Sequence, residues 1–188
     1  MPSILNTPPA VEPISLAEAK AHLRAVHADE DQLIGTLINS ARRIVEARSG
    51  LLLIQQTWKC YLDDWPKTGI IDLPLSPVQA IADLAVYGED DIAALIDPAH
   101  YFADTLSRPA RLVMRGSRAW ARPGRAANGI AITLTVGFGA AASAVPAPLR
   151  QVILILVAHW FEHRGNANPP PLPLTLDALI RPYRQVRL

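Results

Sequence analysis

Apolar residues near the start of the chain recur at the spacing that places them on one face of a helix. Leu16, Ala19 and Leu23 follow this spacing and predict a helix over residues 16–26. Ser15 precedes it by one position, and Glu18 stands three residues after Ser15, which is the arrangement of a capping box. Residues 1–14 before this helix are rich in proline, and we expect them to form an extended lead-in.

A second helix is predicted over residues 29–49, joined to the first by a short acidic turn. Its apolar positions at helical spacing are Leu33, Ile34, Leu37, Ile38, Ala41, Ile44 and Val45. Acidic residues in its first turn suit the positive end of the helix dipole, and Gly50 supplies a C-terminal stop.

The pattern changes between residues 51 and 138, where short runs of β-branched and aromatic residues alternate with turn residues. The clearest run is residues 130–136, in which Ile130, Ile132 and Leu134 alternate with smaller residues. We therefore predict a small antiparallel β lobe over residues 51–138.

A third helix is predicted over residues 149–164, where nearly every position as far as Ala158 is apolar. A linker rich in proline and asparagine follows, and residues 166–188 are expected to form the linker and a C-terminal docking tail. The predicted fold class is therefore α+β. It is mainly a helical bundle, with two N-terminal helices and a long apolar C-terminal helix, and the small β lobe is inserted into an adaptor domain of residues 15–165.

Charge is nearly balanced overall, at +1, but its sign is distributed unevenly. Between positions 83 and 104 there are six acidic residues and no lysine or arginine: Asp83, Glu89, Asp90, Asp91, Asp97 and Asp104. Between positions 108 and 125 there are six arginines and no acidic residue: Arg108, Arg111, Arg115, Arg118, Arg122 and Arg125. Blocks of opposite sign can pair within one subunit or between copies.

Several classes of protein are disfavoured. Cys60 is the only cysteine, so no disulfide can form within the chain. The first residues lack the basic and apolar regions of a signal peptide. The longest apolar run, residues 152–161, is well short of the roughly 20 residues of a membrane span. We expect synthesis in the cytoplasm and no cofactor.

One short motif allows a catalytic alternative. His159, Glu162 and His163 match the H-x-x-E-H pattern of some zinc proteases, in which two histidines hold Zn²⁺ and the glutamate acts as general base. A third ligand would have to come from downstream, where Asp177 is the only acidic residue. The competing interpretation is an ordinary helix end, with His163 near the negative end of the dipole.

The order of several short stretches resembles that of the head–tail connector (adaptor) proteins of long-tailed phages, prophages and gene transfer agents. These stretches are Pro13-Ile14-Ser15-Leu16-Ala17-Glu18-Ala19-Lys20-Ala21-His22-Leu23, Leu73-Pro74-Leu75-Ser76-Pro77-Val78, Val145-Pro146-Ala147-Pro148-Leu149-Arg150-Gln151, Ala158-His159-Trp160-Phe161-Glu162-His163-Arg164 and Leu179-Ile180-Arg181-Pro182-Tyr183-Arg184. The resemblance extends from about Pro13 to the C-terminus.

The resemblance implies a structural role in a virion. Such proteins form a ring, typically of twelve copies, under the portal of a DNA-filled head; the ring carries the stopper and lines the channel for double-stranded DNA. The expected portal-docking tail comprises Arg181, Pro182, Tyr183, Arg184, Val186 and Arg187. A frayed terminus is the alternative. Another ring protein of the neck, or a tail terminator, is the alternative within the same particle.

The two charged blocks are candidate contact surfaces. The basic block, with Arg111, Arg115, Arg118, Arg122 and Arg125, either binds acidic residues of a neighbouring subunit, faces DNA, or is solvated. The acidic block, Glu89, Asp90 and Asp91, is its expected counterpart at a subunit interface. Trp120 is the only aromatic residue within the basic block, so base stacking is not supported.

Overall fold

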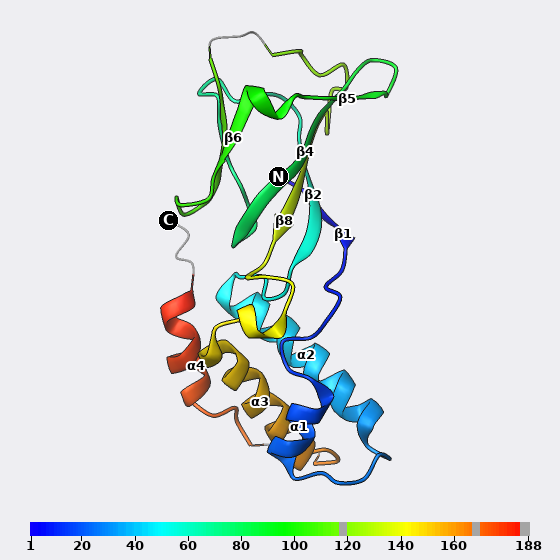
Figure 1. The fold of residues 1–188 in the computed structure, drawn as a ribbon, viewed down its shortest axis with the longest axis vertical. Coiled ribbons are helices and arrows are strands. Elements are labelled where there is room, and N and C mark those ends of the chain that lie inside the picture. Colours follow the sequence, from blue (N-terminus) through cyan, green and yellow to red (C-terminus); the bar gives the residue numbers. More distant parts are fainter. Residues whose placement is uncertain (117–119, 167–169, 185–188) are drawn as a thin grey trace. The chain divides into compact units, whose positions relative to one another are not determined.

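The computed structural model describes residues 1–116, 120–166 and 170–184, and they belong to two compact units. The sheet unit consists of Met1–Pro9 and Gln55–Phe138, and the helical unit consists of Ala10–Ile54 and Gly139–Leu188. Each unit is therefore assembled from two separate stretches of chain (Figure 1). The functional division into a lead-in of residues 1–14, an adaptor domain of 15–165 and a tail of 166–188 stays a prediction.

The helical unit begins with a capped helix. Its α-helices are α1 (Leu16–Leu23), α2 (Asp31–Ser49), α3 (Ala147–Glu162) and α4 (Thr175–Ile180), with short 3₁₀ turns η2 (Ala142–Ala144) and η3 (Arg181–Tyr183). The capping box is confirmed: the backbone N–H of Glu18 donates to Oγ of Ser15 (3.2 Å), and the backbone N–H of Ser15 donates to Oε2 of Glu18 (2.9 Å). Helix α1 ends at Leu23, three residues earlier than predicted, because Arg24 adopts a left-handed conformation.

The core of the helical unit lies between α2 and α3. Ile34, Ile38, Ala41 and Val45 are buried along one face of α2, and Gly50 ends the helix with a φ of 74°. The buried positions of α3 are Leu149, Val152, Ile153, Leu156 and Val157. Helix α3 contacts α1, α2 and α4, so the helical unit itself covers most of its apolar surface. A subunit interface is not required to explain that apolarity.

The sheet unit contains the strands of the molecule. They are β1 (Ser3–Thr7), β2 (Gln56–Leu62), β3 (Ile70–Asp72), β4 (Val78–Tyr87), β5 (Ala93–Leu95), β6 (Tyr101–Asp104), β7 (Arg111–Met114) and β8 (Ile130–Val136), with the 3₁₀ turn η1 (Pro98–His100). A five-stranded sheet has the order β1-β2-β8-β4-β5 (Figure 1). A three-stranded sheet has the order β3-β7-β6. All pairings between these strands are antiparallel.

Strand β8 is the centre of the larger sheet. It pairs with β2 from Gln56↔Val136 to Leu62↔Ile130 and with β4 on its other side. Large and small residues alternate along β8, and Ala131 and Thr133 are buried as well as Ile132 and Leu134. The face of β8 that carries these small residues is therefore covered and not open to solvent.

The predicted fold class, mainly a helical bundle with a small inserted β lobe, is wrong. The described residues contain eight strands in two antiparallel sheets, and these sheets form a compact unit of their own. The long apolar C-terminal helix is wrong as well, because α3 ends at Glu162 and the chain continues into α4. Strand β5 has only three residues, which is too few to show a period. Strand β1 pairs with a strand that is distant in sequence, so short-range sequence patterns do not show how large the sheets are.

Candidate interaction surfaces

The basic segment of residues 120–129 is attached to the acidic β4–β5 turn of the same chain. The backbone N–H of Gly124 donates to the carbonyl of Tyr87 (2.8 Å). A Cβ atom on Gly124 would lie 2.1 Å from the backbone nitrogen of Glu89, so only glycine allows this close approach. The guanidinium of Arg125 lies 3.8 Å from the centroid of the Tyr87 ring and forms an ion pair with Asp91. The acidic and basic blocks thus meet within one chain at this point.

Arg111 also has a partner within the chain. It lies on β7 rather than in a loop, and its Nη2 donates to Oδ2 of Asp104 on β6 (2.7 Å). The Ser107 hydroxyl donates to the same oxygen (2.6 Å). These hydrogen bonds, from Ser107 first and then from Arg111, hold the pKa of Asp104 well below its ordinary value.

The other arginines of the basic block differ from Arg111 and Arg125. Arg115 is exposed, with its guanidinium 5.6 Å from the Phe102 ring centroid, and Arg122 is exposed as well. Among the described residues, neither forms an ion pair with a carboxylate. Arg118 lies outside the described residues. Glu89 and Asp90 are exposed, so part of each block remains available to a partner.

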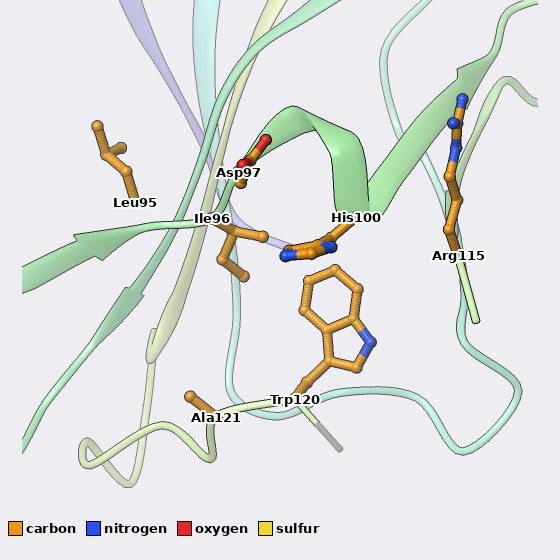
Figure 2. Close-up of a pocket in the computed structure, with 7 residues that line it drawn as sticks. All are labelled: Leu95, Ile96, Asp97, His100, Arg115, Trp120 and Ala121. Atoms are coloured by element: carbon orange, nitrogen blue, oxygen red, sulfur yellow. The ribbon is translucent and has the colours of Figure 1, made fainter. Parts of the chain in front are cut away.

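Two surface cavities flank Trp120. One of about 330 Å³ is lined by Leu95, Ile96, Asp97, His100, Arg115, Trp120 and Ala121 (Figure 2). The other, of about 560 Å³, includes Trp65, Lys67 and Arg122 in its lining. The Trp65 and Trp120 ring centroids are 4.9 Å apart, and Nε1 of Trp65 donates to the carbonyl of Ala121 (2.9 Å). The Asp97 carboxylate accepts from the backbone N–H of Ala99 (2.8 Å), so it caps η1.

The described part of the predicted docking tail lies against the end of α2. Nε of Arg184 donates to the carbonyl of Arg48 (3.3 Å), and a terminal nitrogen of Arg184 is 3.6 Å from Asp177. Arg181 and Pro182 are exposed, and Tyr183 is half-buried. Val186 and Arg187 of the predicted tail lie outside the described residues. The tail is tethered, because Leu176 and Ile180 of α4 are buried just before it.

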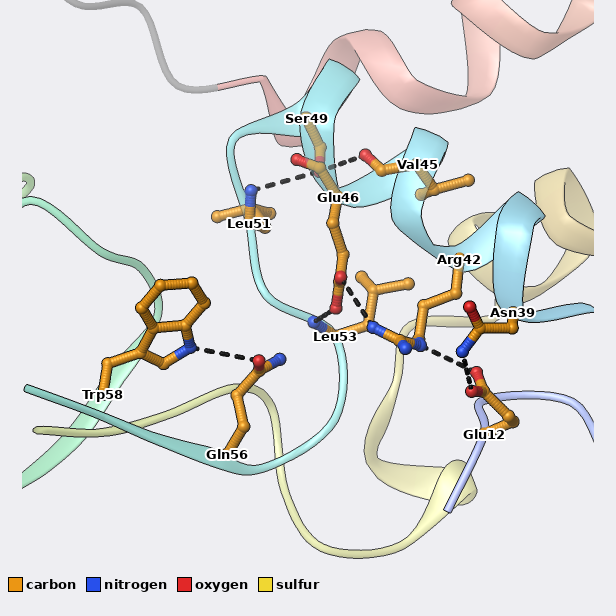
Figure 3. A network of polar contacts seen from close by, with 10 residues as sticks. All are labelled: Glu12, Asn39, Arg42, Val45, Glu46, Ser49, Leu51, Leu53, Gln56 and Trp58. Carbon is orange, nitrogen blue, oxygen red and sulfur yellow. Dashed lines mark hydrogen bonds and ion pairs between the residues drawn. The ribbon is translucent and has the colours of Figure 1, made fainter. Parts of the chain in front are cut away.

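A buried polar network in the helical unit was not anticipated from the sequence (Figure 3). The side chain of Arg42 is enclosed, with its Nε donating to Glu12 (2.7 Å) and its Nη1 donating to Glu46 (2.9 Å). The Glu46 carboxylate also accepts from the backbone N–H of Leu53 (2.9 Å). Burial raises the pKa of Glu46, although Leu53 and Arg42 oppose the rise. The available signal was a charged pair four residues apart beside the apolar face of α2.

The H-x-x-E-H residues lie at the end of α3. The His159 and His163 ring centroids are 4.7 Å apart, and Nδ1 of His163 lies 2.7 Å from the carbonyl of His159. Within residues 1–116, 120–166 and 170–184, no three histidine, cysteine or carboxylate side chains are grouped as metal ligands. None of the helices in these ranges has the length and apolarity needed to cross a lipid bilayer.

Known proteins resemble the chain over its whole length. Residues 13–105 match the model of a family described as phage gp6-like head-tail connector proteins. A chain from the neck of an empty GTA particle computed with C6 symmetry is 26% identical, with a TM-score of 0.84 over 100% of this chain and 97% of that one. A chain from the neck of a native GTA particle computed with C12 symmetry is 26% identical, with a TM-score of 0.77 over 98% and 97%.

A further solved structure supports the same fold. A chain from the virion of a native gene transfer agent (GTA) particle is 23% identical, with a TM-score of 0.80 over 98% of this chain and 97% of that one. No curated protein matches the chain.

Proposed function

We propose that the chain is the adaptor subunit of a phage-like neck, because residues 13–105 match the model of the phage gp6-like head-tail connector proteins. It is a structural component of the virion. In this proposal, copies of the chain form a ring below the portal. The ring carries the stopper on its far side, and double-stranded DNA passes through its channel without sequence-specific contacts.

The observation that carries this proposal is the similarity to a neck chain over 100% of this chain and 97% of that one. The similarity includes the two sheets and the four helices together, rather than one common motif. A shared domain alone can serve many functions, but a match in both units at 26% identity supports a shared station in the particle.

Twelve copies is the number we propose for the ring. One similar neck was computed with C12 symmetry and another with C6 symmetry, and a twelve-fold ring satisfies both. A closed ring requires a heterologous contact, in which each copy uses two different surfaces. The sheet unit has distinct surfaces at its two edges, which suits this requirement.

The tail supplies the proposed contact with the portal. Helix α4 anchors the tail through Leu176 and Ile180, while Arg181 and Pro182 remain exposed. The ion pair between Arg184 and Asp177 is solvent-exposed and contributes little stability, so a partner can replace it at low cost.

In this proposal, DNA in the channel is contacted by the arginines that have no carboxylate partner in the described chain. Arg115 and Arg122 are exposed, whereas Arg111 and Arg125 neutralise acidic side chains within the subunit. Since DNA must slide through the neck, a few phosphate contacts suit the channel better than base readout.

We propose no catalytic role. The geometry of His159, Glu162 and His163 is that of a helix end, with one imidazole nitrogen beside a backbone carbonyl. Zinc analysis of the purified chain tests this directly. About one bound metal per chain would return the hydrolase alternative to consideration.

Deleting residues 181–188 tests the proposed function. We expect the truncated chain to keep its fold, because Leu176 and Ile180, the buried residues of α4, are retained. Tailed particles should fall by about tenfold or more, since the portal contact is removed. Electron microscopy of purified particles counts the tails, and cryo-EM of the neck shows which station the chain occupies.

Arg48→Ala is the matched control, because it breaks the ion pair with Asp177 but keeps the tail. It should assemble normally. Normal necks in the truncated variant would overturn portal docking through the tail. A ring of this chain elsewhere in the particle would identify it as another neck protein or a tail terminator.

A further inference from the structure

The five-stranded sheet ends in two open strands. Strand β1 forms one edge and β5 forms the other. Every residue of β5 is exposed, as are all residues of β1 after Ser3. An open edge presents unpaired backbone N–H and C=O groups, which are a template for pairing with another chain.

The hydrogen bonds around β1 identify the backbone groups that point outwards. The backbone N–H of Tyr61 donates to the carbonyl of Pro2 (3.0 Å), so position 2 faces β2. Backbone groups alternate in direction along an antiparallel strand. Ile4 therefore also faces β2, and the N–H and C=O groups of Ser3 and Leu5 point to the open side.

The same reasoning applies to β5. The N–H of Gly88 donates to the carbonyl of Ile92 (3.0 Å), and the N–H of Ile96 donates to the carbonyl of Leu84 (2.8 Å). Positions 92, 94 and 96 therefore face β4, and the backbone groups of Ala93 and Leu95 point outwards. No described residue donates to or accepts from these outward groups.

Neither edge is blocked by charge or proline, although β5 is only three residues long and β1 has a register shift between Leu5 and Thr7. Natural edge strands are commonly blocked by charged residues or by proline within the strand. Strand β1 reads SILNT and β5 reads AAL, with no charge and no proline in either. Ile4 is 60% exposed and Leu95 is 72% exposed, so each edge also presents an apolar side chain.

We propose that β5 of one copy pairs with β1 of the next copy, so that the sheets of neighbouring subunits become continuous. This rests on the proposed function, which supplies the ring. A cyclic ring requires two different surfaces on each copy, and the two edges of this sheet are such surfaces. The partner that covers each edge is therefore a second copy of this chain.

The direction of the new pairing follows from the topology. Four antiparallel steps separate β1 from β5, so the two strands run the same way. Rotation about an axis roughly parallel to the strands preserves their direction, and the junction is then parallel. If Ala93 lies opposite Ile4, the outward backbone groups of Ser3 and Leu5 can form hydrogen bonds with those of Ala93 and Leu95.

This register also brings the exposed apolar side chains together. Ile4 pairs with Lys59, which pairs with Thr133, and Leu95 pairs with Ala85, which pairs with Ala131. Residues 131 and 133 are two apart on β8, so their side chains share a face of the sheet. Ile4 and Leu95 therefore lie on one face and become diagonal neighbours across the junction.

Cysteine pairs test the junction in assembled particles. The variant Ile4→Cys/Ala93→Cys, treated with a short bismaleimide, should give a ladder of covalent oligomers that reaches the full ring. Each single variant should give no ladder, because a copy then carries only half of each junction. Leu5→Cys/Ala93→Cys is the matched control, since the side chain at position 5 lies on the opposite face. The native Cys60 is fully buried.

A charge swap provides the second test. Ile4→Glu should reduce ring formation by about tenfold, and adding Leu95→Lys to the same chain should restore it. Rings without the ladder and without a response to Ile4→Glu would overturn the edge pairing and leave the adaptor role standing. If the chain is missing from the neck altogether, the proposed function fails instead.

Discussion

Arg42 in the helical unit and Arg125 in the sheet unit both bind carboxylates, but only Arg42 is enclosed. Arg42 is 7% exposed and binds Glu12 and Glu46 together. Arg125 pairs with Asp91, whose side chain is 71% exposed, and covers the Tyr87 ring. The first arrangement fixes the N-terminal segment to α2, whereas the second is accessible to a competing partner.

The apolar surfaces of the two units differ in the same way. In the helical unit, α3 is covered by α1, α2 and α4. In the sheet unit, both outer strands of the larger sheet remain open, and Leu95 is among the exposed apolar residues. The difference indicates that α3 is covered within its own unit, while the edge strands keep backbone groups to which no described residue is hydrogen-bonded.

Replacing Arg42 should give the largest effect on stability. Arg42→Met leaves Glu46 buried without its cation, and breaking a buried pair in this way typically costs about 3–5 kcal/mol. Urea unfolding followed by circular dichroism measures the loss. Arg125→Met is the matched control in the sheet unit, where an exposed pair is worth less than about 1 kcal/mol. Equal losses in the two variants would contradict the comparison.

A smaller effect is expected in the pH dependence of stability, which should have opposite signs for Glu46 in the helical unit and Asp104 in the sheet unit. Burial raises the pKa of Glu46 above its ordinary 4.5, so its carboxyl binds a proton more tightly when folded. The contribution of Glu46 to the free energy of unfolding is therefore present below pH 4.5 and is lost as pH rises through the pKa of the folded state. The free energy of unfolding should change by less than about 1.4 kcal/mol per pH unit in this range. The pH dependence from Asp104 has the opposite sign. Because its pKa is lowered in the folded state, Asp104 stabilises the fold above pH 3.8, its ordinary pKa, and this stabilisation is lost on acidification.

The measurement is the free energy of unfolding across the acidic range, for the parent chain and two variants. Glu46→Gln should remove the fall in stability above pH 4.5, and Asp104→Asn should remove the fall at lower pH. If both variants change the same part of the curve, the assigned signs are wrong.

Local patterns allowed one helix start and one helix stop to be predicted. The capping box at Ser15 and Glu18 and the stop at Gly50 depend on residues adjacent in sequence, and both are present. The sheets could not be predicted in this way, because β1 pairs with residues fifty or more positions away. The open edges depend on that pairing, so the sequence offered no route to them.

The charged blocks show the same limit at the level of the candidate surfaces. Their composition predicted pairing, but it left open whether the pairs form within a subunit or between copies. The structure places Arg111 beside Asp104 and Arg125 beside Asp91 in one chain. Hydrogen bonds from distant segments, such as the one from Gly124 to Tyr87, bring the two blocks together, and no local pattern encodes them.

The smallest effect on stability is expected where the arginines lack a carboxylate partner in the described chain. Arg115→Glu/Arg122→Glu should change the free energy of unfolding by less than about 0.5 kcal/mol, since both side chains are exposed. If these arginines face DNA, the affinity of assembled necks for a duplex should lose part of its salt dependence, by a slope of about 1 for each contact removed. If they bind a neighbouring protein instead, the necks should fail to assemble. Normal necks with an unchanged salt slope would mean that both arginines are solvated, and the sheet unit would then act through its open edges alone.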